Sequence, residues 1–279
     1  MDPQEVQLPS HHRIVLDRFL AACQTDERVL VACLVGSYAK GTADTYSDLD
    51  LFLLTSDDAY DDFCAGREAF IRRLGEPVFL DDFGSVAFVL FILADGTEGE
   101  LGVGRESQVH SLFSGPYKVL LDKKHLLTGA VVPAREAAVP EPEQIETLRR
   151  QVYWFWHDLS HFTTAMGRGQ LWWASGQLEA LRLYCVNLAR LRQNIADEDV
   201  GAEGYFKVEQ VLSQEQLSPL QATFCPQEPG TMIQAALVIV RFYQALAPHL
   251  AQTHGITYPA RLECVMLDRL KALGDLHAK

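Results

Sequence analysis

Two aspartates one residue apart, Asp48 and Asp50, open an apolar run in the sequence SDLDLFLLT. Side chains at positions i and i+2 of a β-strand point to the same face, so a strand here places both carboxylates side by side while Leu49 and Leu51 point into a core. Two such carboxylates without a partner repel each other, which raises one pKa and destabilises the start of the strand. A divalent cation removes this repulsion, and oxygen-only ligands completed by water and phosphate oxygens are typical of Mg²⁺.

The residues before the aspartates have the composition of a phosphate-binding loop. Gly36 lets the backbone approach an oxyanion closely, Ser37 offers a hydroxyl and an N–H group, and Gly41 turns the chain back. Each of these features alone is ordinary turn chemistry ahead of a strand. Their order between two apolar strands favours a loop that holds a triphosphate beside the metal. The candidate nucleotide contacts are Gly36, Ser37, Lys40, Thr42 and Ser47.

The elements that must position this loop follow from the hydrophobic periodicity. Residues 11–24 carry a helical stripe, RVLVACLVG is typical of a buried strand, and DLDLFLLT resumes the strand pattern. The stretch SDDAYDDFCAGREAFIRRL predicts one helix with a solvated acidic first turn. Two β-like runs then flank Asp95-Gly96, which predicts a hairpin.

Beyond about residue 130 the spacing of the apolar residues changes to that of helices. The segment GAVVPAREAAVPEPEQ is rich in proline and small residues and predicts a linker. Four long segments of helical period follow it, at 145–166, 170–195, 231–253 and 259–276. The prediction is therefore an α+β chain of two domains: residues 1–135 with a mixed β-sheet and flanking helices, and residues 136–279 as an all-α helical bundle.

Composition limits the partners and the compartment. The 279 residues carry a formal net charge of −13, and Lys and Arg form no cluster, which disfavours nucleic acid and favours a small, cationic substrate. Six scattered cysteines without a CxxC pair are typical of reduced thiols and disfavour a zinc–thiolate site. The sequence shows neither a secretory signal nor an uninterrupted apolar span, so we expect a cytoplasmic protein without membrane contact. The oligomeric state stays open, a homodimer included.

A family resemblance rests on the ordered motif. Gly36-Ser37, Gly41-Thr42 and Ser47-Asp48-Leu49-Asp50 fit the pattern GSxxxGTxxxxSDxD, which resembles that of the DNA polymerase β-like nucleotidyltransferase superfamily. The chain length and helical second half look like the antibiotic nucleotidyltransferases, particularly the lincosamide and aminoglycoside enzymes. The resemblance implies transfer of a nucleoside monophosphate, AMP from ATP or the equivalent from another NTP, to a hydroxyl of a small antibiotic-like acceptor with Mg²⁺ as cofactor. It also implies that residues 1–135 are catalytic and that residues 136–279 contribute to the acceptor cleft.

The superfamily further implies a third carboxylate on a neighbouring strand, usually an aspartate. In TEGELGVG, after the predicted hairpin turn, Glu100 falls at that place. Glu98 shares its strand face by parity and is the rival, as is a residue of the second domain. The sequence leaves open whether the longer glutamate binds a second metal ion, acts as the base for the acceptor hydroxyl, or does neither. The predicted catalytic and metal-binding set is Asp48, Asp50 and Glu100.

Several residues of the second half are weaker candidates. Lys207 in GYFKVEQ is a candidate phosphate contact, although a lone lysine is more often a solvated charge. His157 and His161 have the spacing of a metal-binding pair, but HDLSH lacks the glutamate of HExxH and no third ligand is in view, so hydrogen-bonded or surface histidines are favoured. Most of a set of aromatics is expected in the core, with one or two lining an acceptor pocket beside Asp158 or Glu179. The set is Tyr153, Trp154, Phe155, Trp156, Trp172 and Trp173.

Two other functions stay open. The same site could act on a protein or an RNA end, although the acidic balance argues against RNA. A non-catalytic, antitoxin-like binding module of the same fold is the other alternative. The intact Asp48, Asp50 and phosphate loop argue against it.

Overall fold

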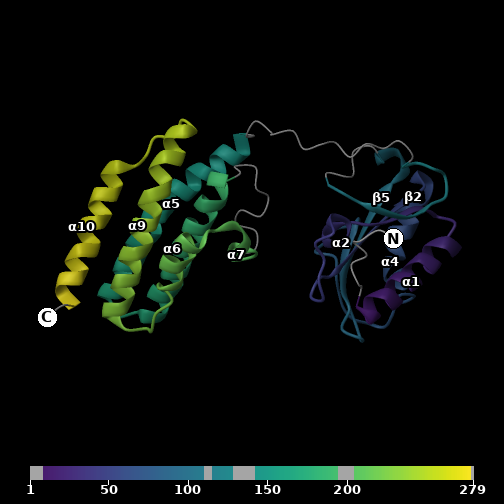
Figure 1. Cartoon of the computed structure of the whole chain (residues 1–279), viewed down its shortest axis with the longest axis horizontal. Coiled ribbons are helices and arrows are strands. Elements are labelled where there is room, and N and C mark those ends of the chain that lie inside the picture. The colour runs from purple at the N-terminus through teal and green to yellow at the C-terminus, as the bar shows by residue number, and fades with distance from the viewer. Residues whose placement is uncertain (1–8, 110–114, 128–141, 194–203, 278–279) are drawn as a thin grey trace. The chain divides into compact units, whose positions relative to one another are not determined.

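The computed structural model describes residues 9–109, 115–127, 142–193 and 204–277 (Figure 1). The chain divides into two compact units, Met1–Glu136 and Ala137–Lys279. Most of the predicted linker, at residues 129–141, lies outside the described residues. The first unit is a mixed α/β unit built on one sheet, and the second is a helical bundle, so the predicted fold class is confirmed.

Six strands form one sheet in the described part of the first unit, in the order β3-β4-β5-β2-β1-β6. Strands β2 and β5 pair in parallel, and every other neighbouring pair is antiparallel. The parallel pair lies in the middle of the sheet, where both strands are covered by partners. The strands are β1 (Val29–Leu34), β2 (Leu49–Thr55), β3 (Pro77–Asp81), β4 (Phe88–Leu93), β5 (Glu98–Arg105) and β6 (Lys118–Asp122).

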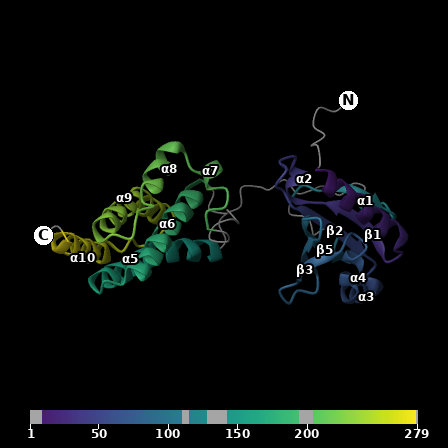
Figure 2. The same cartoon turned by 90° about the horizontal axis from the view of Figure 1, so that it is seen from below.

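The sheet is buried on both sides of its centre, which explains why β1 is uniformly apolar. Leu49, Leu51 and Leu53 of β2 join one core cluster with residues of α1 (Ser10–Thr25), α3 (Tyr60–Ala65) and α4 (Arg67–Ile71). Leu30, Val31 and Cys33 of β1 belong to a second, smaller cluster with Leu54, Val109 and Leu127. Figure 2 shows α1, α3 and α4 around the strands. The alternation in β2 thus directs its leucines inward, as predicted.

The acidic stretch after β2 differs from the prediction of one helix. It forms a 3₁₀ turn at Asp57–Ala59 and two short helices, α3 and α4, which break at Gly66. The expectation of a solvated acidic turn is confirmed, because Asp57, Asp58, Asp61 and Asp62 are all exposed, and three of these carboxylates also have partners. Asp61 pairs with Arg105 at 2.8 Å and Asp62 with Arg28 at 2.6 Å, while Asp57 accepts hydrogen bonds from Ser107. These contacts fix the helical segment to the ends of β1 and β5.

The described residues of the second unit form four long helices and two short ones. The sequence predicted all four long helices. It did not predict the two short helices, which lie between the second and the third long helix. Phe155 and Trp156 lie in the bundle core, where Phe155 stacks on Tyr243 with ring centroids 3.7 Å apart. The helices are α5 (Pro142–Gly167), α6 (Leu171–Gln193), α7 (Val208–Val211), α8 (Gln214–Gln221), α9 (Pro229–Thr253) and α10 (Ala260–His277).

Helix α9 is the most apolar helix of the bundle. Among the described residues it alone is long and apolar enough to cross a membrane by length and composition, and half of its most apolar window is buried. Met232, Ile239 and Tyr243 of this helix belong to the core cluster of the second unit. Burial against the neighbouring helices accounts for the apolar composition of α9.

Candidate active site

Three carboxylates meet where β2 begins. One oxygen of each of Asp48, Asp50 and Glu100 lies within 4.8 Å of the others, and all three side chains are half-buried. Asp50 and Glu100 are paired residues of the parallel strands β2 and β5, and Asp48 directly precedes β2. Glu98, the predicted rival, is exposed and is not part of this cluster. The parallel register therefore brings together the carboxylates that the sequence separates by about fifty residues.

Gly36 lies against the carboxylate of Asp50. Strand β1 ends at Leu34, and the Val35 N–H group donates to the Asp50 carbonyl at 3.0 Å, which brings the chain across the start of β2. Gly36 has a φ of +57°, and a Cβ atom placed on it would lie 1.6 Å from Asp50 Oδ2. Both the backbone conformation and the lack of space therefore require glycine at this position.

The turn after Gly36 forms the short helix α2 (Gly36–Lys40) and then reverses. Gly41 ends the helix with a φ of +71°, and the N–H groups of Gly41 and Thr42 both donate to the Ser37 carbonyl. The Ser37 hydroxyl is buried and has no hydrogen-bond partner in the part of the chain that the structure describes. A buried hydroxyl of this kind is costly unless another group bonds to it, and a phosphate oxygen is a suitable acceptor.

The other predicted loop contacts have visible structural roles or are exposed. Ser47 Oγ accepts from the Asp44 N–H group at 2.9 Å, and Asp44 Oδ1 accepts from the Tyr46 N–H group at 2.8 Å, so Asp44 closes the turn that leads into β2. Sequence reasoning missed Asp44, although an Asx turn is a frequent role for aspartate ahead of a strand. Lys40 and Thr42 are exposed on the loop.

A buried histidine, His12, contacts Tyr38 of the loop that follows β1. Sequence reasoning missed this residue. His12 of α1 is 3% exposed, and its Nδ1 atom lies 2.7 Å from the hydroxyl of Tyr38, which belongs to α2. Burial lowers the pKa of His12, with His11 acting in the same direction and Asp95 and Asp48 opposing it. Burial also raises the pKa of Tyr38. The signal in the sequence is that His12 lies three residues before Val15, on the buried stripe of the helix.

The second unit holds the remaining candidates. Lys207 is exposed at the start of α7, with Nζ 4.3 Å from the centre of the Phe206 ring, so its predicted phosphate contact stays a prediction. Asp158 Oδ2 accepts from the Tyr184 hydroxyl at 3.0 Å, and Glu179 pairs with Arg182.

The prediction that most of the aromatic set lies in the core is wrong. Phe155 and Trp156 are fully buried, but Trp154, Trp172 and Trp173 are 50%, 84% and 37% exposed. Successive residues on a helix point about 100° apart, so a run of aromatics covers more than one face of α5, and Trp154 is exposed while Phe155 and Trp156 enter the core.

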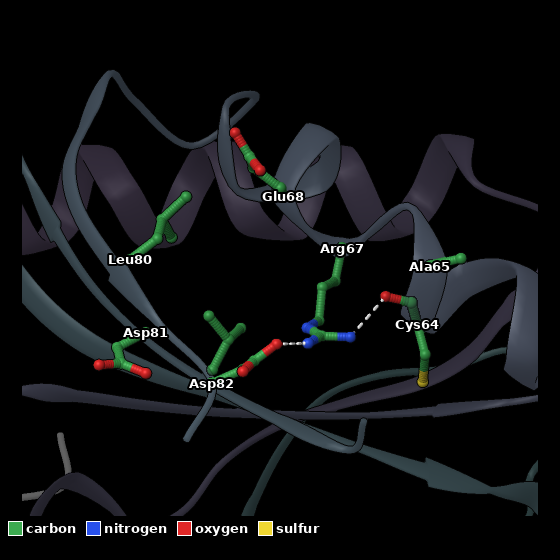
Figure 3. A pocket seen from close by; sticks show the side chains of 8 residues that line it. Cys64, Ala65, Arg67, Glu68, Leu80, Asp81 and Asp82 are labelled. Carbon is green, nitrogen blue, oxygen red and sulfur yellow. Dashed lines mark hydrogen bonds and ion pairs between the residues drawn. The ribbon is translucent and has the colours of Figure 1, made fainter. Parts of the chain in front are cut away.

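A separate cavity of about 350 Å³ in the first unit contains none of the candidate site residues. Arg67 lies at its centre (Figure 3), where it donates to the Cys64 carbonyl at 2.8 Å and pairs with Asp82. A further hydrogen bond from Arg67 reaches the Ser85 carbonyl at 3.2 Å. Arg67 thus links α4 to the segment between β3 and β4 through Asp82 and Ser85.

Comparison with known proteins supplies the family. Among solved structures, the chain is similar to an aminoglycoside 6-adenyltransferase from Bacillus subtilis, with 15% identity, a TM-score of 0.45 and coverage of 95% of this chain and 99% of that one. A complex of E. coli MS115-1 CdnC with HORMA-deltaN matches at 14% identity and a TM-score of 0.28, over 86% of this chain and 92% of that one. No curated protein matches the sequence. The family model described as streptomycin adenylyltransferase matches residues 11–272. The chain therefore belongs to the streptomycin adenylyltransferase family and is a nucleotidyltransferase of the adenylyl-transferring type, which confirms the resemblance inferred from its GS, GT and SDxD residues.

Proposed function

We propose that Asp48, Asp50 and Glu100 hold the Mg²⁺ ion that accompanies ATP, and that the enzyme transfers AMP to a hydroxyl group of a small cationic antibiotic of the aminoglycoside class. The observation that carries the proposal is the cluster of three carboxylate oxygens within 4.8 Å of one another, with Gly36 packed against one of them. The match to the streptomycin adenylyltransferase family supports the acceptor class. A lincosamide acceptor is the alternative.

The donor set fits a magnesium nucleotide. Three carboxylates supply hard oxygen ligands without nitrogen or sulfur, which is the preference of Mg²⁺. The metal, when bound, would neutralise charge on the triphosphate and on the leaving pyrophosphate. The absence of a side chain at Gly36 lets the loop pack against Asp50, and the buried Ser37 hydroxyl would donate to a phosphate oxygen. Lys40 and Lys207 are proposed as further phosphate contacts, since both are exposed cations.

The reaction is an in-line displacement. The acceptor hydroxyl oxygen forms a bond to the α-phosphorus, the bond from this phosphorus to the pyrophosphate oxygen breaks, and the hydroxyl proton passes to a carboxylate. We assign Glu100 as the proton acceptor, through the carboxylate oxygen that does not bind the metal, because it lies in the cluster and its side chain is longer than those of the two aspartates. No covalent intermediate with the protein is required. The negative charge of the chain favours a cationic acceptor, for which we propose contacts from residues 136–279, in a cytoplasmic enzyme.

The direct test is a transfer assay with purified protein, Mg²⁺, each of the four NTPs and a panel of aminoglycosides and lincosamides. The expected result is release of pyrophosphate and an antibiotic whose mass increases by one AMP group. Asp48→Asn and Asp50→Asn should each abolish transfer while the melting temperature is retained, because the replacements keep size and polarity. Substantial turnover by Asp50→Asn would disprove the metal assignment, and labelling of a macromolecule in place of the antibiotics would disprove the acceptor class.

A further inference from the structure

A second group of potential metal ligands lies on α5, in the second unit. His157 and His161 are one helical turn apart, with ring centroids separated by 4.3 Å. One ligand atom of each histidine and one carboxylate oxygen of Asp158 all lie within 4.8 Å of one another. The spacing of the histidines alone does not make a site, but Asp158 supplies the third ligand that the sequence pattern lacks. We propose that His157, Asp158 and His161 bind one divalent transition-metal ion of the Zn²⁺ or Ni²⁺ class.

The carboxylate of this group is held in place by a residue of another helix. Asp158 Oδ2 accepts a hydrogen bond of 3.0 Å from the Tyr184 hydroxyl of α6, while Oδ1 lies 2.9 Å from His157 Nδ1. An outer hydrogen bond of this kind orients a ligand and strengthens metal binding.

The distances require only small movements of side chains. Two ligand atoms that each lie about 2.1 Å from a tetrahedral zinc ion are separated by about 3.4 Å. The separation of His157 Nδ1 from Asp158 Oδ1 is 2.9 Å, about 0.5 Å shorter than this value, and the side chain of His157 is 48% exposed. Three protein ligands also leave a coordination position for water or a small molecule, as in other open zinc sites.

The ligands of this group favour a different metal ion from the one that the carboxylate cluster of the first unit favours. Two imidazoles with one carboxylate suit Zn²⁺, Ni²⁺ and Cu²⁺, whereas Mg²⁺ prefers oxygen ligands alone. The competing interpretation is a metal-free hydrogen bond between His157 and Asp158. In that interpretation, substitution of His161 leaves metal affinity unchanged, whereas the proposed site loses a ligand. His161 therefore distinguishes the two interpretations.

Two tryptophans supply an optical signal for the test. The Trp154 ring centroid lies 4.7 Å from that of His157, and the Trp173 centroid lies 5.7 Å from that of His161. A bound paramagnetic Ni²⁺ ion should therefore quench tryptophan fluorescence. The full chain is titrated with Ni²⁺, and separately with Zn²⁺ in a calorimeter, in millimolar Mg²⁺ to occupy the carboxylate cluster. A Cys264→Ser background removes the exposed thiol as a competing ligand.

The expected result is saturable binding of one ion per chain, with concurrent quenching. His157→Ala and His161→Ala should each weaken binding by about tenfold or more, and Tyr184→Phe by about tenfold. His249→Ala is the matched control, because His249 is an exposed histidine of α9 outside the group, and it should bind as the parent does. Unchanged affinity in His161→Ala, or binding that does not saturate, would overturn the proposal and indicate an adventitious ion only.

Two features keep the outcome interpretable. Far-UV circular dichroism and melting temperature establish that each variant is folded, and His161→Gln, which retains a polar side chain, replaces His161→Ala if the alanine variant unfolds. The measurements use neither nucleotide nor antibiotic. Failure of the metal site and failure of the proposed adenylyl transfer are therefore separate results.

Discussion

At the scale of single residues, Gly36 has the closest contact for an added Cβ atom among the described glycines. Its φ of +57° strains any other residue, and a methyl group there would collide with Asp50 Oδ2. Gly41 offers a matched comparison, because it has a φ of +71° but open space around it. The two glycines thus separate the effect of backbone strain from the effect of contact with the carboxylate.

The first prediction uses this pair. Gly36→Ala and Gly41→Ala should each destabilise the fold by about 1 to 3 kcal/mol through backbone strain. Only Gly36→Ala should also displace the Asp50 carboxylate and abolish adenylyl transfer. Melting temperature and turnover are measured for both variants. Equal losses of turnover in the two would show that loop conformation, and not the approach to Asp50, determines activity.

The second prediction distinguishes the two glutamates of β5. Glu100 lies in the carboxylate cluster, and Glu98, two residues earlier on the same strand, is exposed. Glu100→Gln should reduce turnover by about 10² to 10⁴-fold, the usual contribution of a general base. Glu98→Gln should retain the activity of the parent. The reverse order of effects would assign the third carboxylate to Glu98.

At the scale of elements, the contact of α1 with α2 predicts a pH dependence. His12 has a lowered pKa in the folded state because it is buried against Tyr38, whereas the unfolded chain has the usual value of 6.5. Below pH 6.5 the unfolded chain therefore binds the proton first, and the free energy of unfolding decreases by at most about 1.4 kcal/mol per pH unit until the folded-state pKa is reached.

The third prediction follows from this decrease in the free energy of unfolding at low pH. His12→Gln retains a polar side chain but removes the titration, so its unfolding free energy should depend less steeply on pH below 6.5 than that of the parent. The loss of stability relative to the parent should be largest near pH 8. Denaturant unfolding at a series of pH values measures both quantities. Parallel curves for the two proteins would exclude His12 as the titrating group.

The elements that the sequence predicted are those with strong local patterns. The buried strands β1 and β2 and the long helices of the bundle carry many apolar residues at a clear period. Strand β3 escaped prediction because it is a short edge strand with Val78 and Phe79 exposed, so no alternation marks it. The break at Gly66 was missed because the helical spacing continues across it.

At the scale of the whole molecule, the candidate site combines local and distant information. The proximity of Asp48 and Asp50 follows from strand geometry alone. Their proximity to Glu100 requires the parallel register of β2 with β5, which pairing of distant segments determines and no local pattern specifies. The same holds for His12 and Tyr38, which lie on separate helices. A family pattern could point to Glu100, but it gave no sign of His12.

The last prediction concerns the field of the whole chain. A net charge of −13 attracts a polycationic acceptor at long range, and salt at about 0.15 M screens charges beyond about 8 Å. The KM for an aminoglycoside should therefore increase with ionic strength while kcat changes little, because screening affects the encounter and not the displacement at phosphorus. A lincosamide, with fewer positive charges, should show a weaker dependence if it is a substrate. Steady-state kinetics over a salt series measures both constants, and a KM that is independent of salt would refute electrostatic attraction of the acceptor.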